Sequence, residues 1–338
     1  MLFSYQKGVK LLRCVATVSI GLALLVVMLG AYTRLTNAGL GCPDWPGCYG
    51  RMAVSSLQGE LPNAQARFPD VPIEARKAWT EMVHRYAAGA LVLLIVLMNA
   101  YGCVVSEAPR RIPLVLLFLV AFQALLGMWT VTLKLFPLVV MGHLLGGLLI
   151  FSCLCYYRAQ LSSVKRVGNP NWRFWITFGL LLIFCQIALG GWVSSNYAGV
   201  ACIGFPTCNG RWLPHFDFSH AFNLFLPVGA NYQGGVLDSA ARVTIQFVHR
   251  LGALVVATYV LILSGWLWFR VYFIPLRIAA FMAIFLVLVQ VGLGIINVVY
   301  QLPLQIAVLH NGVAALLLAL FFMMRYVVSG GARNEKCF

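Results

Sequence analysis

The chain has 338 residues, of which 61% are hydrophobic and only 10% are charged. An ordinary soluble domain has about 25% charged residues, so this composition excludes a soluble globular protein, a disordered chain and a coiled coil. The net charge is +15, with 24 Lys and Arg against 9 Asp and Glu. Such a surplus indicates nucleic-acid binding in a soluble protein, but in a membrane protein it reports the orientation of the loops.

Eight apolar runs are long enough to cross a bilayer, which takes about 20 residues each. They lack the two-residue alternation of a membrane β-barrel, and the first is too long for a cleaved signal peptide. We therefore predict an all-α membrane protein with eight transmembrane helices. They lie near residues 12–33, 79–105, 112–133, 137–157, 174–195, 243–269, 273–297 and 303–326.

The basic residues are unevenly divided between the two sides of this arrangement. The side with both termini has 14 basic residues and two acids, Glu107 and Glu335, for a net charge of +12, whereas the other side has +3. The positive-inside rule then predicts cytoplasmic termini. It places two long loops, 34–78 and 196–242, on the outer side, and nucleic acid is not expected as a partner.

The two halves of the chain match each other. Residues around the first long loop recur at an offset of 160, and later residues recur at offsets of 165 to 167. The matched pairs include Gly30 with Gly190, Cys42 with Cys202, Cys48 with Cys208, His84 with His249, Gln123 with Gln290, Gly127 with Gly294, and His143 with His310. Because each unit has an even number of spans, we predict two parallel-repeat four-helix bundles. The expected divisions are 1–158, a cytoplasmic linker at 159–173, and 174–338.

Four histidines lie inside predicted spans, in the outer half of the bilayer: His84, His143, His249 and His310. An ionisable residue there is costly and indicates function. A hydrogen bond between helices would explain one such histidine, but not four at matched places. Two histidines per bundle are too few for structural zinc, whereas they suit the axial ligation of a haem iron.

Residues beside these histidines fit the same interpretation. Arg85 and Arg250 each follow the first histidine of a pair and are predicted to bind haem propionates, with snorkelling to lipid headgroups as the alternative. Nearby glycines would let a flat ring approach the backbone, or would serve helix packing. They are Gly89, Gly142, Gly146, Gly147, Gly252 and Gly312. His215 and His220 lie in a polar loop and are expected to be solvated.

Four cysteines lie in the outer loops as two C-x5-C pairs, Cys42 with Cys48 and Cys202 with Cys208. An oxidising compartment favours two local disulfides, and zinc is disfavoured because no further ligands accompany either pair. The other six are expected to be reduced, small apolar residues. They are Cys14, Cys103, Cys153, Cys155, Cys185 and Cys337.

The acidic residues distinguish the halves. Glu81 stands three residues before His84, whereas Gln246 stands at the matched place before His249, and Asp44 of the first loop matches Gly204. A carboxylate near an iron site can move protons or stabilise positive charge. We therefore expect a catalytic first half and a permanent cofactor in the second. The alternatives are a solvated helix-start acid and a di-iron site, which would need more carboxylates.

Two segments and the histidines carry a family resemblance over nearly the whole chain. The first reads Arg34-Leu35-Thr36-Asn37-Ala38-Gly39-Leu40-Gly41-Cys42-Pro43-Asp44-Trp45-Pro46-Gly47-Cys48, and the second reads Lys77-Ala78-Trp79-Thr80-Glu81-Met82-Val83-His84-Arg85. With His143, His249 and His310, they resemble the haem A synthase family. A cysteine pair in each long outer loop is similar to the bacterial, proteobacterial-type members.

The resemblance implies an oxidoreductase that converts haem O to haem A for cytochrome c oxidase. The family oxidises the C8 methyl group to a formyl group through hydroxylated intermediates. By resemblance, His249 and His310 ligate a resident haem b, and His84 and His143 hold haem O, with Glu81 assisting the oxidation. The family links the disulfide in the place of Cys42–Cys48 to activity, whereas that in the place of Cys202–Cys208 would be structural.

The resemblance also implies a bacterial inner membrane with periplasmic cysteine loops. The expected partners are haem O, membrane lipid, the haem O synthase and an electron acceptor, and a homo-oligomer stays open. An insertion near 51–76 departs from the second half and would be a lid or a partner surface. The main alternative is a membrane dihaem b-type electron-transfer protein linked to quinol or thiols. Two further alternatives are a quinone-dependent thiol oxidoreductase and a transporter.

Overall fold

The computed structural model describes residues 2–53, 65–69, 72–105, 108–162 and 164–330. Within these ranges, eight helices are long and apolar enough to cross a membrane, which confirms the predicted all-α fold class and its eight spans. They are α1 (Leu2–Leu35), α3 (Ala75–Val104), α4 (Arg111–Thr132), α5 (Pro137–Gln160), α6 (Pro170–Ser195), α8 (Ser239–Arg270), α9 (Ile274–Val299) and α10 (Leu304–Val327). A short helix, α7 (Phe218–Ala221), lies in the second long loop.

The helices extend beyond the predicted apolar runs because their first turns are polar. Asp238 caps α8, and its side chain accepts a hydrogen bond from Ala241 N at 2.8 Å. Asn169 caps α6 in the same way, with Trp172 N as donor at 3.1 Å. Such caps satisfy backbone N–H groups that the helix leaves open. The helix α6 therefore begins at Pro170, before the predicted span at 174, and the division of the chain into 1–158, 159–173 and 174–338 stays a prediction.

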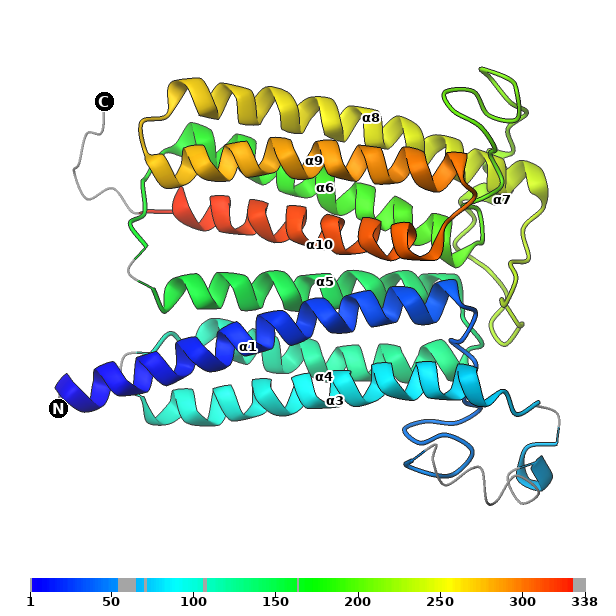
Figure 1. Cartoon of the computed structure of the whole chain (residues 1–338), viewed down its shortest axis with the longest axis horizontal. Helices are drawn as coiled ribbons and strands as arrows, with labels where there is room; N and C mark the ends of the chain where they lie inside the picture. Colours follow the sequence, from blue (N-terminus) through cyan, green and yellow to red (C-terminus); the bar gives the residue numbers. More distant parts are fainter. Residues whose placement is uncertain (1, 54–64, 70–71, 106–107, 163, 331–338) are drawn as a thin grey trace.

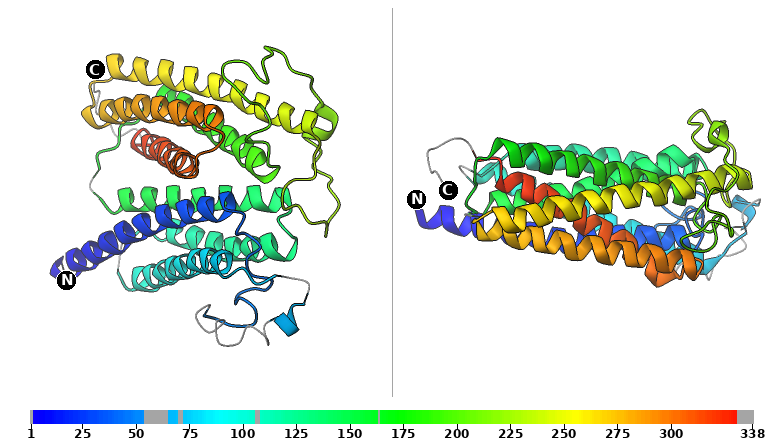
Figure 2. Two further views of the ribbon diagram at one scale, coloured as in Figure 1. Left: turned by 45° about the vertical axis from the view of Figure 1, so that its right-hand side comes forward. Right: turned by 90° about the horizontal axis from the view of Figure 1, so that it is seen from above.

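The spans pack in two groups that meet along α5 and α10 (Figure 1). In one group α1 contacts α3 and α5, and α4 contacts the same two helices; in the other, α8 and α10 each contact both α6 and α9. The groups meet where α10 contacts α5 and α1, and where α5 contacts α6. The views of Figure 2 agree that the spans run along one long direction.

The two ends of this bundle differ in what they carry. The start of α1 and the end of α10 lie at one end, which we call the terminal end (Figure 1). The long loops 36–74 and 196–238 gather at the opposite end, which we call the loop end. The five remaining connections are short, so each places consecutive spans antiparallel.

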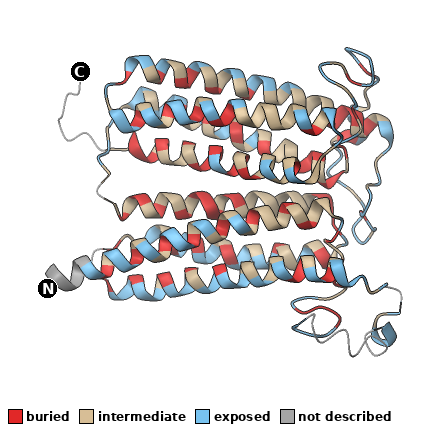
Figure 3. Cartoon of the chain, viewed as in Figure 1, coloured by how far each residue is buried: buried red, intermediate tan, exposed pale blue. Residues whose placement is uncertain are grey.

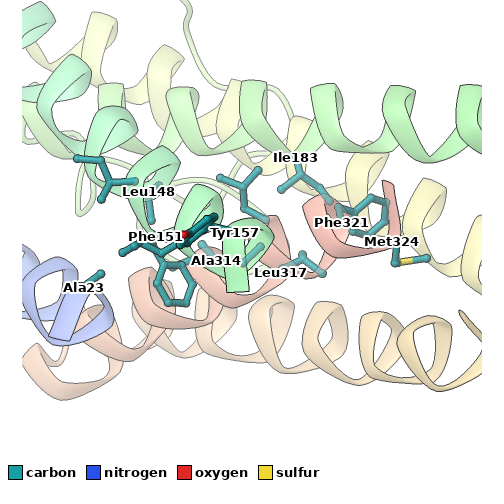
Figure 4. Close-up of a cluster of buried hydrophobic side chains, with 14 of the residues drawn as sticks. Ala23, Leu148, Phe151, Tyr157, Ile183, Ala314, Leu317, Phe321 and Met324 are labelled. Atoms are coloured by element: carbon teal, nitrogen blue, oxygen red, sulfur yellow. The ribbon is translucent and has the colours of Figure 1, made fainter. Parts of the chain in front are cut away.

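The main core lies where the two groups meet, around α5 and α10 (Figure 4). Phe151 and Tyr157 of α5 lie near Ile183 of α6 and Leu317 and Phe321 of α10, and all five are nearly inaccessible. Half of the most apolar stretch of α10 is buried, compared with 22% in α3 and α4, so α10 is the most enclosed span. Figure 3 shows more exposed residues on the outer helices.

The outward faces are apolar as well. Phe118 of α4 is 71% exposed and Ile262 of α8 is 68% exposed. In a soluble protein such residues would mark binding patches. Here they lie on helices of membrane-spanning length, where lipid tails provide the matching solvent.

Several local features occur at matched positions of the two halves. Asn37 and Tyr197 both have left-handed backbones, with φ of 53° and 54°. Near the terminal end, Arg158 Nε donates to Thr17 Oγ1 at 2.9 Å, and Arg325 Nε donates to Thr177 Oγ1 at 2.8 Å. These recurrences agree with the sequence offsets, and the parallel relation of the halves as a whole stays a prediction.

One contact between the groups departs from this correspondence. Arg34, near the end of α1, donates to Ser194 O of α6 at 2.6 Å and lies 4.0 Å from the centre of the Tyr197 ring. Ser194 is the residue that matches Arg34 at the offset of 160. The contact therefore joins two matched positions that have different side chains.

Close packing of α6 against the core gives a first prediction. A Cβ atom at Gly179 would lie 2.7 Å from Phe321 Cε1 and 2.9 Å from Tyr259 Cε1, whereas a Cβ at Gly265 of α8 would meet nothing within 4 Å. We expect Gly179→Val to destabilise the fold by about 1–3 kcal/mol through overpacking. Thermal unfolding in detergent measures the effect, with Gly265→Val as the control. Equal midpoints for the two variants would contradict this packing.

Candidate functional site

The four histidines of the spans lie in the half of the bundle nearest the loop end. His84 is on α3, His143 on α5, His249 on α8 and His310 on α10. Each of these helices starts at the loop end, and each histidine lies within about three turns of that start. The helix directions thus bring all four predicted ligands to one level, two in each group of helices.

The histidines of the first pair face each other. The ring centres of His84 and His143 are 6.4 Å apart, and the ring planes are inclined by 80°. Both Nδ1 atoms are buried with no hydrogen-bond partner. Buried polar atoms are almost always partnered in proteins. The two imidazoles are thus close neighbours in an edge-to-face arrangement, each with a nitrogen that lacks a protein partner.

Glutamines surround the second pair. Gln186 Nε2 lies 3.0 Å from His249 Nδ1 and donates to His249 O at 2.9 Å, and Gln290 Nε2 lies 3.2 Å from His310 Nε2. In the first half, Gln123 donates to the backbone oxygen of His143. The position that matches Gln186 is Val26. The second pair therefore has more polar neighbours than the first.

Each imidazole packs edge-on against a glycine of the preceding span. A Cβ atom at Gly30, Gly127, Gly190 or Gly294 would lie 3.1 to 3.3 Å from the Cε1 atom of His84, His143, His249 or His310, respectively. A larger residue would push the ring from its place, so these glycines fix where each ring can lie.

The six glycines predicted to let a flat haem ring approach the backbone, or to serve helix packing, have other neighbours than the imidazoles, and their role stays a prediction. The space beside Gly146 and Gly252 is filled by Gln123 and Gln186, and that beside Gly312 by Met28. Gly89 faces open space, and Gly142 and Gly147 have no histidine neighbour within 4 Å. The internal repeat could have identified the glycines that contact the imidazoles, because all four of them occupy matched positions.

Glu81 is 5% exposed, and its carboxylate is held on two sides. It accepts a hydrogen bond from Cys42 N at 2.9 Å, and it forms an ion pair with Arg85. This burial rules out the alternative of a solvated helix-start acid. Gln246, at the matched position, is also 5% exposed, and its Oε1 atom has no partner. Only the first half thus has a buried carboxylate on the helix of its first histidine.

Arg85 and Arg250 bind the disulfide loops. Arg85 Nη1 donates to Asp44 O at 2.9 Å and to Pro46 O at 3.2 Å. Arg250 Nη1 donates to Gly204 O at 3.0 Å and to Thr207 O at 3.2 Å. Each guanidinium thus ties its loop to the helix that carries the first histidine. The Arg85 side chain is only 12% exposed, which disagrees with snorkelling to lipid headgroups. Propionate binding stays a prediction.

Both predicted disulfides are present, Cys42–Cys48 and Cys202–Cys208. Asp44 closes the first loop by accepting from Tyr49 N at 2.6 Å and Gly50 N at 2.7 Å. In the second loop, Asn209 Oδ1 accepts from Ile203 N at 2.9 Å. The Asp44 carboxylate therefore has a structural role in the loop. Of Asp44 and Glu81, the two acids that distinguish the first half, Glu81 is the one with a candidate chemical role.

The remaining titratable candidates lie away from the histidine pairs. His215 and His220 are exposed in the second long loop. Hydrogen bonds from Ser219 and His220 lower the pKa of the Asp217 carboxyl to about 2. The five cysteines outside the disulfides in the described ranges are unpaired, and Cys337 lies outside these ranges. Half of the predicted 51–76 insertion lies outside them too, at 54–64 and 70–71.

The donor set fits a haem better than a bare metal ion. No group of three or more His, Cys, Asp or Glu side chains that could hold a metal ion occurs in the described part of the chain. Two apposed imidazoles with unpartnered nitrogens supply only axial ligands, and a macrocycle would supply the others.

Comparison with known proteins agrees with these features. The family model of the cytochrome oxidase assembly proteins matches residues 13–322. A haem A synthase of Shewanella oneidensis is 44% identical over 307 residues, which cover 90% of this chain and 92% of that protein. Haem A synthases of a Caulobacter species and of Shouchella clausii are 29% and 25% identical and cover 87% and 98% of this chain and 89% and 99% of their own lengths. Since these matches span most of its length, the chain belongs to the haem A synthase family of cytochrome oxidase assembly proteins.

Proposed function

We propose that the chain is a haem A synthase, an oxidoreductase of the bacterial inner membrane that oxidises the C8 methyl group of haem O to a formyl group. One observation carries this proposal beyond the family match. Two similar pairs of histidines lie in the membrane, but only the first has a buried carboxylate on the same helix, Glu81. An enzyme with one reacting site and one permanent cofactor site needs such a difference.

In this proposal the first half binds the substrate. His84 and His143 hold haem O, supported by the closeness of their rings and by their unpartnered Nδ1 atoms. Gly30 and Gly127 keep the two rings in position. The fixed geometry keeps the substrate in one orientation, so that the same methyl group is presented each time.

Glu81 is the residue that we propose to assist the oxidation. Its carboxylate accepts a proton from the reacting group or stabilises positive charge that develops there. The N–H of Cys42 and the guanidinium of Arg85 orient it. The first disulfide loop therefore positions the carboxylate, which supports a link between the Cys42–Cys48 disulfide and activity. The Cys202–Cys208 disulfide has no such carboxylate neighbour, because Gln246 replaces it.

The second half would hold a resident haem b, with His249 and His310 as the residues that bind its iron. A haem bound there would supply electron transfer. Gln186 and Gln290 orient the imidazoles through their ring nitrogens, and polar neighbours of a ligand tune its basicity. The glycines Gly190 and Gly294, one turn further along the same helices, pack against the rings at Cε1.

The orientation follows from the charges. We propose that the terminal end is cytoplasmic, because it has a net charge of +12, and that the disulfide loops are periplasmic. The four-helix groups would then correspond to a substrate half and a cofactor half. Haem O and membrane lipid are the expected small partners, and the haem O synthase and an electron acceptor are the expected protein or redox partners.

The alternative of a dihaem electron carrier has less support. A carrier with two permanent haems needs no carboxylate at one of them, and similar surroundings at both would serve it. The two histidine pairs have different surroundings here. The first half has Glu81 where the second has Gln246, and Val26 where the second has Gln186.

Pigment analysis of purified protein tests the proposal directly. We expect protein supplied with haem O to contain haem b together with hydroxylated and formyl products, identified by mass. Haem O recovered unchanged beside haem b would support the dihaem carrier instead.

Substitution of the histidines tests the assignment of the halves. We expect His249→Ala or His310→Ala to remove the resident b-type absorbance, because each loses an axial ligand, whereas His84→Ala should keep it. His215→Ala, in the exposed loop, is the control. Loss of this absorbance in His84→Ala alone would reverse the two halves.

Replacement of the buried carboxylate tests its role. Glu81→Gln should retain haem and the fold, because the second half already has Gln246 beside Arg250. We expect product formation to fall by about 10²–10⁴-fold, the usual contribution of a general acid or base. Glu74→Gln, an exposed acid just before the same helix, is the control. Normal turnover in Glu81→Gln would make this residue a bystander.

A further inference from the structure

A cavity of about 570 Å³ lies at the terminal end, far from the histidines along the bundle axis. It opens between the start of α6 and the segment at the end of α10. Its lining includes Asn169, Arg173, Phe174 and Thr177 on one side, and Arg325 and Val328 on the other. The proposed haem chemistry uses none of these residues.

Two arginines give the cavity its charge. Arg325 donates to Thr177 Oγ1, and its charge is close enough to that of Arg173 for the two to repel each other. The guanidinium of Arg173 is exposed, and no protein partner for it occurs among the described residues. The carboxylates of the described ranges all lie at the loop end, so none of them neutralises this pair. Paired guanidinium groups bind phosphate oxygens well.

The first half has the same arginines in a different arrangement. Arg13 matches Arg173, and Arg158 matches Arg325. Arg13 Nε donates to Leu161 O at 2.5 Å, which closes the gap between α1 and the end of α5. The residue that matches Leu161 is Val328, and in the second half it lines the open cavity instead. The Arg13 side chain thus makes a hydrogen bond within the fold, whereas the guanidinium of the matched Arg173 is available to bind a ligand.

The helix start differs between the halves as well. α6 begins at Pro170 in the wall of the cavity, whereas α1 runs through the matched positions as continuous helix. The partial positive charge of a helix N-terminus therefore adds to the two arginines in the second half alone.

The surroundings indicate that the ligand is amphipathic. Phe174 and Trp175, in the first turns of α6, are 61% and 45% exposed, as is typical of aromatic residues at a membrane interface. Leu181, further along the same helix, is 56% exposed and continues the apolar surface into the membrane. A lipid has both a phosphate for the arginines and acyl chains for this surface.

We propose that this cavity binds the headgroup of an anionic phospholipid, with Arg173 and Arg325 on its phosphate and its acyl chains along the outward face of α6. Basic pockets between membrane helices bind such headgroups. The site is separate from the proposed haem chemistry, so either conclusion can fail without the other.

Native mass spectrometry of the full-length protein in detergent tests the site, with phosphatidylglycerol and phosphatidylethanolamine as probes. We expect wild-type protein to retain phosphatidylglycerol preferentially. Retention should weaken about fivefold in Arg173→Gln and about 25-fold in Arg173→Gln/Arg325→Gln, at roughly 1 kcal/mol per arginine. Arg173→Lys should restore most of the loss, and Arg270→Gln, at the same end but outside the lining, should have no effect.

Three results would overturn the proposal. Equal retention of the two lipids would indicate apolar binding alone, and equal retention by wild type and Arg173→Gln would remove the arginines from the site. Displacement of the lipid by millimolar inorganic phosphate would indicate a site for a free anion. Arg173→Gln decides the matter if the double variant does not fold, because the guanidinium of Arg173 makes no hydrogen bond within the described structure.

Discussion

The bilayer interior has no water to bind polar groups, so each polar group of the eight spans must find its partner within the protein. This constraint explains the helices, and it also explains where the other polar atoms lie. Gln186 and Gln290 meet imidazoles, and the Glu81 carboxylate meets Arg85 and the N–H of Cys42. Among the described residues, the Nδ1 atoms of His84, His143 and His310 are buried without a partner, and these three histidines belong to the set proposed to hold the haems.

Much of this arrangement could be predicted from the sequence, because apolar length and charge bias are local properties. The eight spans, both disulfides and the location of the four histidines in one half of the bundle follow from such signals. The polar first turns of α6 and α8 were missed, since an apolar criterion does not recognise the caps Asn169 and Asp238. The positions of polar side chains were harder to predict. Arg85 and Arg250 point to loop carbonyls because those loops fold back over the helix, which spacing along the chain does not reveal.

The differences between the halves are more informative than the similarities. Matched residues explain the scaffold: glycines against rings, arginines against loops, and arginine–threonine bonds at the terminal end. Unmatched residues occur where the proposed roles diverge, at Glu81, at Gln186 and at the start of α6. At the terminal end, Arg13 donates to the backbone oxygen of Leu161, whereas the matched Arg173 lines an open cavity.

The contact of Arg34 with the second half has a consequence for the proposed repeat. The acceptor at Ser194 is a backbone oxygen, which any residue at that position would supply. The ring of Tyr197 beneath the guanidinium is different, because the matched residue of the first half is Asn37. Two identical N-terminal units would therefore lack this aromatic partner, and the stacking of Arg34 requires the second half.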